Sequence, residues 1–209
     1  MTSTNVIEQH NKIIILASSP EARKFKPIKG YTVIAVNDAI HIAKQYADYW
    51  FTLDPSESNL KIMEDREYGV KYYTAIPEWF GKIESPFQRL RQVQYLDYVH
   101  YLKRVEGAQE DQHMRYGLCT DKDSISTGNS AYGALNLAYH MNPKEIVILG
   151  VNGDRSVPKF DNSMCIGKLD HIPRLFESAK KQLDESGISV YNANRYTMLK
   201  CFEYTDMFD

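Results

Sequence analysis

Short apolar runs alternate along the chain with segments whose apolar residues recur at helical spacing. The runs are rich in Ile, Val and Tyr, which is typical of strands buried on both faces of a sheet. They predict strands at residues 12–17, 31–36, 49–53, 70–75, 145–150 and 188–191. The helical spacing predicts helices at residues 39–46, 131–141 and 173–185. This alternation favours an α/β fold with a mostly parallel, Rossmann-like sheet flanked by helices.

Residues 77–122 break this pattern. From Phe87 to Leu102 an apolar residue recurs at every third position, so the apolar positions drift around a helix and form no stripe. Tyr95 and Tyr98 lie on the same stretch. We expect an irregular lid or acceptor insertion here, within a chain of 209 residues that forms one α/β domain over residues 1–209.

The charge balance narrows the classes of partner. The chain has 25 Lys and Arg against 27 Asp and Glu, a formal net charge of -2. This excludes a generally basic protein that coats nucleic acid, although a local basic patch is compatible with it. The cysteines have no metal or disulfide spacing, and no apolar run is long enough to span a bilayer. We therefore expect a cytoplasmic protein without a membrane partner.

Polar residues directly follow several of the predicted strands. Because the carboxyl ends of parallel strands meet at one edge of a sheet, ligands of such folds bind there. The candidates for ligand contact are Ser18, Ser19, Asn37, Asp38, Asp54, Asn152 and Asp154. Helix caps and turns favour the same residue types, so each position alone is also consistent with a structural role. Their joint occurrence at strand ends is what favours a binding site.

The segment Ser126-Thr127-Gly128 stands at a predicted helix start. Backbone N–H groups at such a start, together with two hydroxyls, suit an anion or a ribose. Gly128 allows a ligand to approach the backbone, and Gly133 inside the helix indicates close packing on the sheet or on a ligand. The chain has neither a Walker sequence nor a Gly-x-Gly-x-x-Gly fingerprint, which argues against P-loop phosphotransfer and common dinucleotide oxidoreductases.

His171 stands in the loop after the strand at residues 145–150, just before a predicted helix. An imidazole at this place faces the ligand cleft and titrates near neutral pH, which suits a general base; a helix-capping or surface histidine is the alternative. Arg155 and Lys159 lie in the same loop, where a cation either neutralises a leaving phosphate or is simply solvated.

Several of these segments together resemble bacterial sialyltransferase-like glycosyltransferases. The resemblance is carried by Ser126-Thr127-Gly128, then Ala138-Tyr139, then Lys-Glu-Ile-Val-Ile-Leu-Gly-Val at residues 144–151. That string is similar to the family's Thr-Ser-Gly, its Ala-rich helix and its Lys-Glu-Ile strand. Residues 13–20, 36–38, 54–55 and 188–191 are similar in kind to other strands and strand ends of the family. The resemblance covers most of the chain outside residues 56–120.

This resemblance implies a nucleotide-sugar-binding domain and an inverting glycosyltransferase that needs no bound metal or other cofactor. The residues it implies for the donor nucleotide are Ser18, Ser19, Asn37, Asp38, Asp54, Ser126, Thr127, Gly128 and Asn152. His171 falls near the family's catalytic base, which deprotonates the acceptor hydroxyl. Arg155 and Lys159 are the candidates to face the leaving phosphate.

The chain also departs from the family pattern. Its first loop, Ala17-Ser18-Ser19-Pro20, lacks the family's glycines, and Asn152 stands where the family has Asp. The two tyrosines with which the family assists the leaving phosphate have no counterpart in residues 152–160. Because of these differences we do not extend the resemblance to sialic acid as the donor sugar.

The acceptor and the reaction class leave alternatives open. The acceptor is a saccharide or, because basic residues and tyrosines interleave between residues 82 and 104, a hydroxymethylated base in phage-type DNA. The same core also resembles archaeal-type hydroxymethylpterin diphosphokinases, which implies ATP and Mg²⁺, with Asp38, Asp54 and Asp154 as metal ligands. A non-catalytic nucleotide-binding module is the third alternative, and all are compatible with a homo-oligomer.

Overall fold

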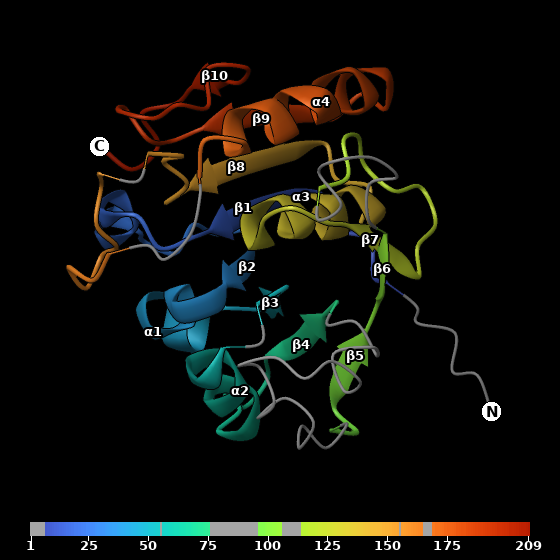
Figure 1. Cartoon of the computed structure of the whole chain (residues 1–209), viewed down its shortest axis with the longest axis vertical. Helices are drawn as coiled ribbons and strands as arrows, with labels where there is room; N and C mark the ends of the chain where they lie inside the picture. The colour runs from blue at the N-terminus through green and yellow to red at the C-terminus, as the bar shows by residue number, and fades with distance from the viewer. Residues whose placement is uncertain (1–6, 55, 76–95, 106–113, 155, 165–168) are drawn as a thin grey trace.

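The computed structural model of the protein describes residues 7–54, 56–75, 96–105, 114–154, 156–164 and 169–209 (Figure 1). Its centre is an eight-stranded sheet with the strand order β10-β9-β8-β1-β2-β3-β4-β5, in which all neighbouring strands run parallel. The strands are β1 (Lys12–Leu16), β2 (Thr32–Val36), β3 (Tyr49–Thr52), β4 (Lys71–Thr74), β5 (Val99–Tyr101), β8 (Glu145–Leu149), β9 (Ser189–Asn192) and β10 (Glu203–Tyr204). A separate parallel pair consists of β6 (Lys103–Val105) and β7 (Ser124–Ser126).

Helices cover both faces of this sheet. The α-helices are α1 (Ile40–Ala43), α2 (Glu57–Glu64), α3 (Ser130–His140) and α4 (Ile172–Glu185), and the 3-10 helices are η1 (Pro20–Lys24), η2 (Asn37–Ala39) and η3 (Lys44–Tyr46). Apolar side chains of α3 and α4 share one core cluster with one face of the sheet. Those of η1, α1 and α2 share a second cluster with the opposite face.

The central strand β1 shows why its sequence is an uninterrupted apolar run. Ile13 and Ile15 point to the α3 and α4 side, whereas Ile14 and Leu16 point to the other side. All four side chains are fully buried. Each contributes about 1.5–3 kcal/mol by leaving water, so β1 anchors both layers of helices to the sheet.

The order in which strands are added leaves a crevice beside β1. The chain places β2 to β5 on one side of β1 and then returns to the other side for β8 to β10. Figure 1 shows the strands following one another from β10 at the top to β5 at the bottom. The loops after β1 and β8 therefore leave the sheet in different directions, and ligands of such sheets bind between them.

Helix α3 lies close to the sheet, and nearly all of its residues are buried. A Cβ atom on Gly133 would lie 2.7 Å from Cε1 of Phe51 in β3, closer than carbon atoms approach in proteins. The glycine thus allows the helix to pack directly on the sheet. Of the two roles expected for Gly133, packing on the sheet is the one that the structure shows.

The structure confirms the predicted fold class and places a strand or helix at every predicted position. It adds helix α2 and the strands β5, β6, β7 and β10, which the apolar pattern did not predict because they are short and carry many polar residues. Helix α3 begins at Ser130, whereas the sequence placed the helix start at Ser126-Thr127-Gly128.

Of residues 77–122, the part described includes β5, which extends the main sheet, and β6. Residues 76–95 and 106–113 lie outside the described residues, so the lid stays a prediction.

None of the helices in the described part of the chain is long and apolar enough to cross a membrane.

His140 makes the stability of the fold depend on pH. The imidazole is buried at the end of α3, with Nε2 2.9 Å from the carbonyl oxygen of Ser124 in β7. Burial lowers the pKa of His140 below its ordinary value of 6.5. Near pH 6.5 the unfolded chain therefore binds a proton that the folded protein does not, and the free energy of unfolding falls as the pH drops below that value.

We expect the His140→Gln variant to lose part of this pH dependence, because glutamine does not titrate. Urea unfolding of the native chain and the variant between about pH 7.5 and about pH 5.5 measures the difference. The free energy of unfolding should fall more steeply for the native chain. Equal slopes would show that His140 is not linked to folding.

Candidate functional site

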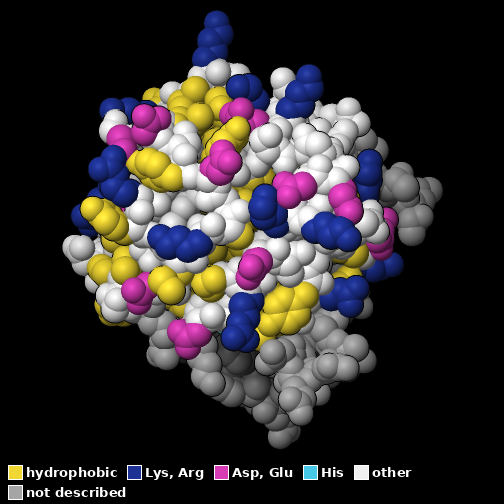
Figure 2. All heavy atoms as spheres, turned by 90° about the horizontal axis from the view of Figure 1, so that it is seen from above, with side chains coloured by type: hydrophobic (Ala, Val, Ile, Leu, Met, Phe, Trp, Pro, Cys, Tyr) yellow, Lys and Arg dark blue, Asp and Glu magenta, His cyan; other side chains and the backbone are white. Residues whose placement is uncertain are grey.

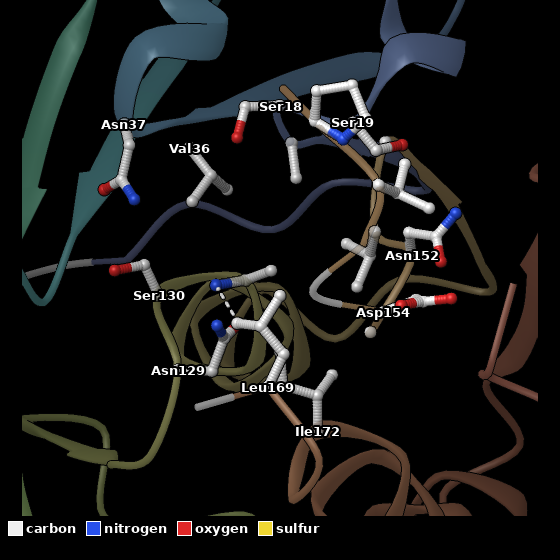
Figure 3. Close-up of a pocket in the computed structure, with 17 residues that line it drawn as sticks. Ser18, Ser19, Val36, Asn37, Asn129, Ser130, Asn152, Asp154, Leu169 and Ile172 are labelled. Atoms are coloured by element: carbon white, nitrogen blue, oxygen red, sulfur yellow. Dashed lines mark hydrogen bonds between the residues drawn. The ribbon is translucent and has the colours of Figure 1, made fainter. Parts of the chain in front are cut away.

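A pocket opens at the carboxyl ends of β1, β2 and β8, where the strand order reverses (Figure 3). Residues 17–19 after β1, residues 36–37 at the end of β2 and residues 150–154 after β8 line it. Residues 129–131 at the start of α3 add a fourth side, and Leu169 and Ile172 add an apolar wall. The empty space between these residues measures about 530 Å³, open solvent included.

The start of α3 faces this pocket with its first N–H groups already capped. Oδ1 of Asn129 accepts hydrogen bonds from the backbone N–H groups of Ala131 at 2.8 Å and Tyr132 at 3.3 Å. The hydroxyl of Ser130 accepts from the backbone N–H of Leu53 at 3.1 Å. The positive end of the helix dipole still faces the pocket, so an anion is favoured there through the field of the helix.

Asn37 presents its amide nitrogen to the pocket. Its Oδ1 accepts from the Thr52 hydroxyl at 2.7 Å and from Nδ2 of Asn59 at 3.4 Å, so the oxygen faces β3 and α2. Nδ2 then points into the pocket (Figure 3). Asn37 has a φ of 52°, a left-handed conformation that asparagine adopts more readily than most residues. The β2 end thus supplies an oriented hydrogen-bond donor.

The loop after β8 crosses over the end of β1 and reaches β2. The backbone N–H of Phe160 donates to the carbonyl oxygen of Ser18 at 2.7 Å. One residue earlier, Nζ of Lys159 lies 2.7 Å from Oδ2 of Asp38, and both side chains are mostly buried. Lys159 and Asp38, both of which the sequence assigned to the donor site, therefore form an ion pair beside the pocket. This ion pair holds the loop in place.

Asp154 stands in the same loop and lines the pocket. Its Oδ1 accepts from the backbone N–H and from the hydroxyl of Ser156, both at 2.8 Å. These two hydrogen bonds lower the pKa of the carboxyl group, so Asp154 is ionised at neutral pH.

A buried asparagine that the sequence did not single out joins the ends of β1, β8 and β9. Oδ1 of Asn194 accepts from the backbone N–H of Gly150 at 2.8 Å, and its Nδ2 donates to the carbonyl oxygen of Val151 at 2.8 Å. The same Nδ2 lies 3.3 Å from the Ser19 hydroxyl. Asn194 is 1% exposed. The rule that polar residues directly follow strands does not find it, because β9 ends at Asn192 and Ala193 stands between that end and Asn194.

His171 lies next to the apolar wall of the pocket but is not among the residues that line it. It is partly buried, and its Nε2 lies 3.0 Å from the carbonyl oxygen of Gly128. A carbonyl oxygen accepts only, so this contact assigns the proton to Nε2 and leaves Nδ1 as the basic atom. The structure thus brings His171 and Gly128 together, beside the start of α3.

The remaining predicted residues lie apart from the pocket. The hydroxyls of Ser126 and Thr127 are buried and donate to the carbonyl oxygens of Gly117 and Val105, at 2.9 and 3.0 Å. Asp54 is exposed, and its Oδ1 accepts from the backbone N–H of Ser56. These contacts give all three residues structural roles in this arrangement. Arg155 lies outside the described residues.

The structure also adds pocket residues that sequence reasoning did not propose. Asn129, Ser130, Leu169 and Ile172 line the pocket. Asn129 was detectable as a helix cap, because Asn directly before an apolar helical pattern is a strong start signal. Leu169 and Ile172 carry no such signal, since isolated apolar residues in a loop look alike whether they face a core or a ligand.

Within the described ranges, no group of three or more His, Cys, Asp or Glu side chains is arranged to hold a metal ion. The diphosphokinase hypothesis requires three metal ligands, which are Asp38, Asp54 and Asp154. In the structure each of these carboxylates is bonded to another residue: Asp38 to Lys159, Asp54 to Ser56 and Asp154 to Ser156.

Comparison with known proteins gives a structural match. No family model and no curated protein sequence matches the chain. A structure of the sialyltransferase CstII from Campylobacter jejuni in complex with cytidine-5'-monophosphate aligns with a TM-score of 0.53 and 11% identity, over 96% of this chain and 87% of that one. The same enzyme in complex with CMP-3FNeuAc aligns with a TM-score of 0.52 and 11% identity, over 93% and 84%.

The protein has a sialyltransferase-like fold. This confirms the fold that the first family resemblance implied, and the comparisons give no support to the resemblance to diphosphokinases. At 11% identity the match concerns the fold alone, so the reaction has to be argued from the pocket.

We expect replacement of Asn194 to destabilise the protein strongly. Asn194→Ala leaves the buried Gly150 N–H without its partner, at a cost of about 1–3 kcal/mol, whereas the Val151 carbonyl keeps the hydrogen bond from the Thr197 hydroxyl at 3.0 Å. Urea unfolding measures the loss. The control is Asn11→Ala at an exposed position, where the change should stay within about 0.5 kcal/mol. Equal effects of the two substitutions would remove Asn194 from its proposed structural role.

The ion pair between Lys159 and Asp38 should couple the β8 loop to β2. We expect a double-mutant cycle with Lys159→Met and Asp38→Asn to give a coupling of about 1 kcal/mol in the free energy of unfolding. The two side chains are 27% and 17% exposed, so the pair lies between surface pairs and buried pairs. A coupling near zero would mean that the loop is held by other contacts.

Proposed function

We propose that the protein is a glycosyltransferase that moves a sugar from a nucleotide-activated donor to an acceptor hydroxyl. The observation that carries the proposal is the position and lining of the pocket. It lies where a parallel sheet reverses its strand order, and its mainly apolar lining includes the hydroxyl and amide side chains of Ser18, Asn37 and Asn152. The fold is similar to that of CstII, whose two structures contain CMP and CMP-3FNeuAc.

The donor nucleotide contacts the β1, β2 and β8 ends in this proposal. Ser18, Asn37 and Asn152 offer hydrogen bonds to base, ribose or phosphate oxygens. The dipole of α3 favours the phosphate at the same side of the pocket as Asn37. Ser19 supports this arrangement, because its hydroxyl donates to Glu21 and its backbone N–H to the carbonyl oxygen of Gly150.

Transfer requires a base for the acceptor hydroxyl, and we assign this role to His171 through Nδ1. Nδ1 takes the proton as the acceptor oxygen attacks the anomeric carbon from the face opposite the leaving group. The bond between the anomeric carbon and the phosphate oxygen breaks, its electron pair stays on the phosphate, and the configuration inverts. The Gly128 carbonyl stabilises the resulting imidazolium, because its oxygen accepts the Nε2–H.

Lys159 and Arg155 are our candidates to neutralise the leaving phosphate, and no resident metal is part of the proposal. Lys159 contacts Asp38 in this structure, so it would exchange that carboxylate for phosphate when the donor binds. The exchange would couple donor binding to a shift of the β8 loop.

A saccharide hydroxyl is the acceptor that we propose. On the side where α4 and β10 lie, Lys and Arg side chains are mixed with Asp and Glu and form no continuous basic surface (Figure 2). On α4, Lys180 pairs with Asp184 and Lys181 with Glu185. Most of the basic stretch at residues 82–104, on which the DNA acceptor was based, lies outside the described residues.

The first test is binding. Calorimetric titration of the whole chain with CMP, UDP, GDP and ADP, and then with their sugars, identifies the donor class. The proposal expects binding of at least one nucleotide sugar without added metal. Binding of ATP with Mg²⁺ and of no nucleotide sugar would contradict it.

The second test separates catalysis from binding at His171. His171→Gln retains an N–H that can donate to the Gly128 carbonyl but has no basic nitrogen, whereas His171→Ala loses both. We expect transfer to a saccharide acceptor to fall by about 10²–10⁴-fold in each variant, with the nucleotide affinity nearly unchanged. Transfer by His171→Gln within about tenfold of the native rate would exclude His171 as the base.

A further inference from the structure

The pocket carries a charge that fits poorly with a phosphate ligand. Among the described residues that line it, Asp154 is the one with a charged side chain. Its carboxylate is held by the backbone N–H and the hydroxyl of Ser156, and the same bonds lower its pKa. A turn alone explains the bonds to Ser156, but it does not explain why the carboxylate lines the pocket.

Asp154 and the groups that favour a phosphate lie on opposite sides of the pocket. In Figure 3, Asn37 and Ser130 lie on one side, whereas Asn152 and Asp154 lie on the other. Repulsion between a phosphate and the carboxylate of Asp154 drives the phosphate to the Asn37 side, where the α3 dipole attracts it. Of the two groups attached to the phosphate, we assign the nucleoside to Ser18 and Asn37, so the sugar is the group that extends toward Asp154.

The surroundings of Asp154 suit a sugar ring. Oδ1 accepts both hydrogen bonds from Ser156, so Oδ2 is the oxygen to which a ligand hydroxyl can donate. Leu169 and Ile172 line the pocket as well and offer apolar surface to the C–H groups of the ring. Such a combination of one carboxylate and an apolar wall recognises hydroxyl groups and disfavours a second negative charge.

We propose that Asp154 determines donor specificity by accepting hydrogen bonds from the hydroxyls of an uncharged sugar, so that the protein selects neutral sugar nucleotides against those of sialic or uronic acids. This inference rests on the proposed glycosyltransferase function and specifies its substrate class.

The experiment compares a neutral and an anionic sugar on the same nucleotide. The probes are UDP, UDP-glucose and UDP-glucuronate; GDP, GDP-mannose and GDP-mannuronate; and CMP, the methyl ester of CMP-sialic acid and CMP-sialic acid. Calorimetric titration of the whole chain gives a Kd for each. For every nucleotide that binds, we expect the neutral sugar to bind at least about tenfold more tightly than the anionic sugar.

Asp154→Asn provides the matched variant. Its amide oxygen can still accept from Ser156, but it carries no charge, so the difference between neutral and anionic donors should shrink to about threefold or less. The control is Asp161→Asn. Asp161 forms the same turn with Ser163, with bonds of 2.9 and 2.7 Å, at an exposed position that does not line the pocket. The control should keep the native selectivity.

The outcomes separate this inference from the proposed function. Binding of nucleotides with an anionic sugar preferred, or with no difference between the two sugars, would overturn the role of Asp154 and leave the glycosyltransferase proposal standing. Unchanged selectivity in Asp154→Asn would overturn it as well. If none of the nine probes binds, and ADP and its sugars do not bind either, the proposed function fails and this inference fails with it.

Discussion

The structure depends on how the backbone groups at the ends of β1 and β8 are satisfied. These strands pair along their length, and then their chains separate to form a pocket. Where the two chains separate, buried backbone N–H and carbonyl groups lose the hydrogen-bond partners that the neighbouring strand supplies. Leaving these groups without partners is costly in free energy, so other groups have to replace the lost partners. Ser19 bonds to the Gly150 carbonyl and Asn194 to the Gly150 N–H and the Val151 carbonyl. A Cβ on Gly150 would lie 2.3 Å from the carbonyl oxygen of Ala17, so the close approach also requires glycine.

In the pocket beside these strand ends, several polar side chains are already held in one orientation by hydrogen bonds. The amide of Asn37 is oriented by Thr52, and the carboxylate of Asp154 is held by Ser156. Such preorganised groups bind a ligand with little loss of side-chain entropy. The pocket is therefore polar on two sides, has an ionised carboxylate on one of them and is apolar near α4. That asymmetry is the basis for assigning a phosphate to one end and a sugar to the other.

The sequence predicted the main elements because apolar periodicity reflects burial, and the buried strands and α4 have unambiguous patterns. It did not predict β7, since Ser124 and Ser126 are polar although both are buried. The functional site was predicted only in part, because the sequence pattern shows where a polar residue stands but not what its side chain contacts. Strand-end polarity locates Ser18, Asn37 and Asn152, but it does not show which way a hydroxyl points. Ser126 and Thr127 bond to backbone carbonyls, and the bonds form through tertiary contacts that local sequence does not encode.

The central claim is that a nucleotide binds between the ends of β1, β2 and β8 at the start of α3. Hydrogen–deuterium exchange of the whole chain, with and without the nucleotide that binds most tightly, tests it most directly. The account predicts slower exchange in the segments that contain residues 17–19, 36–37, 129–131 and 150–154. Slower exchange confined to other parts of the chain, or binding without any change in these segments, would contradict it.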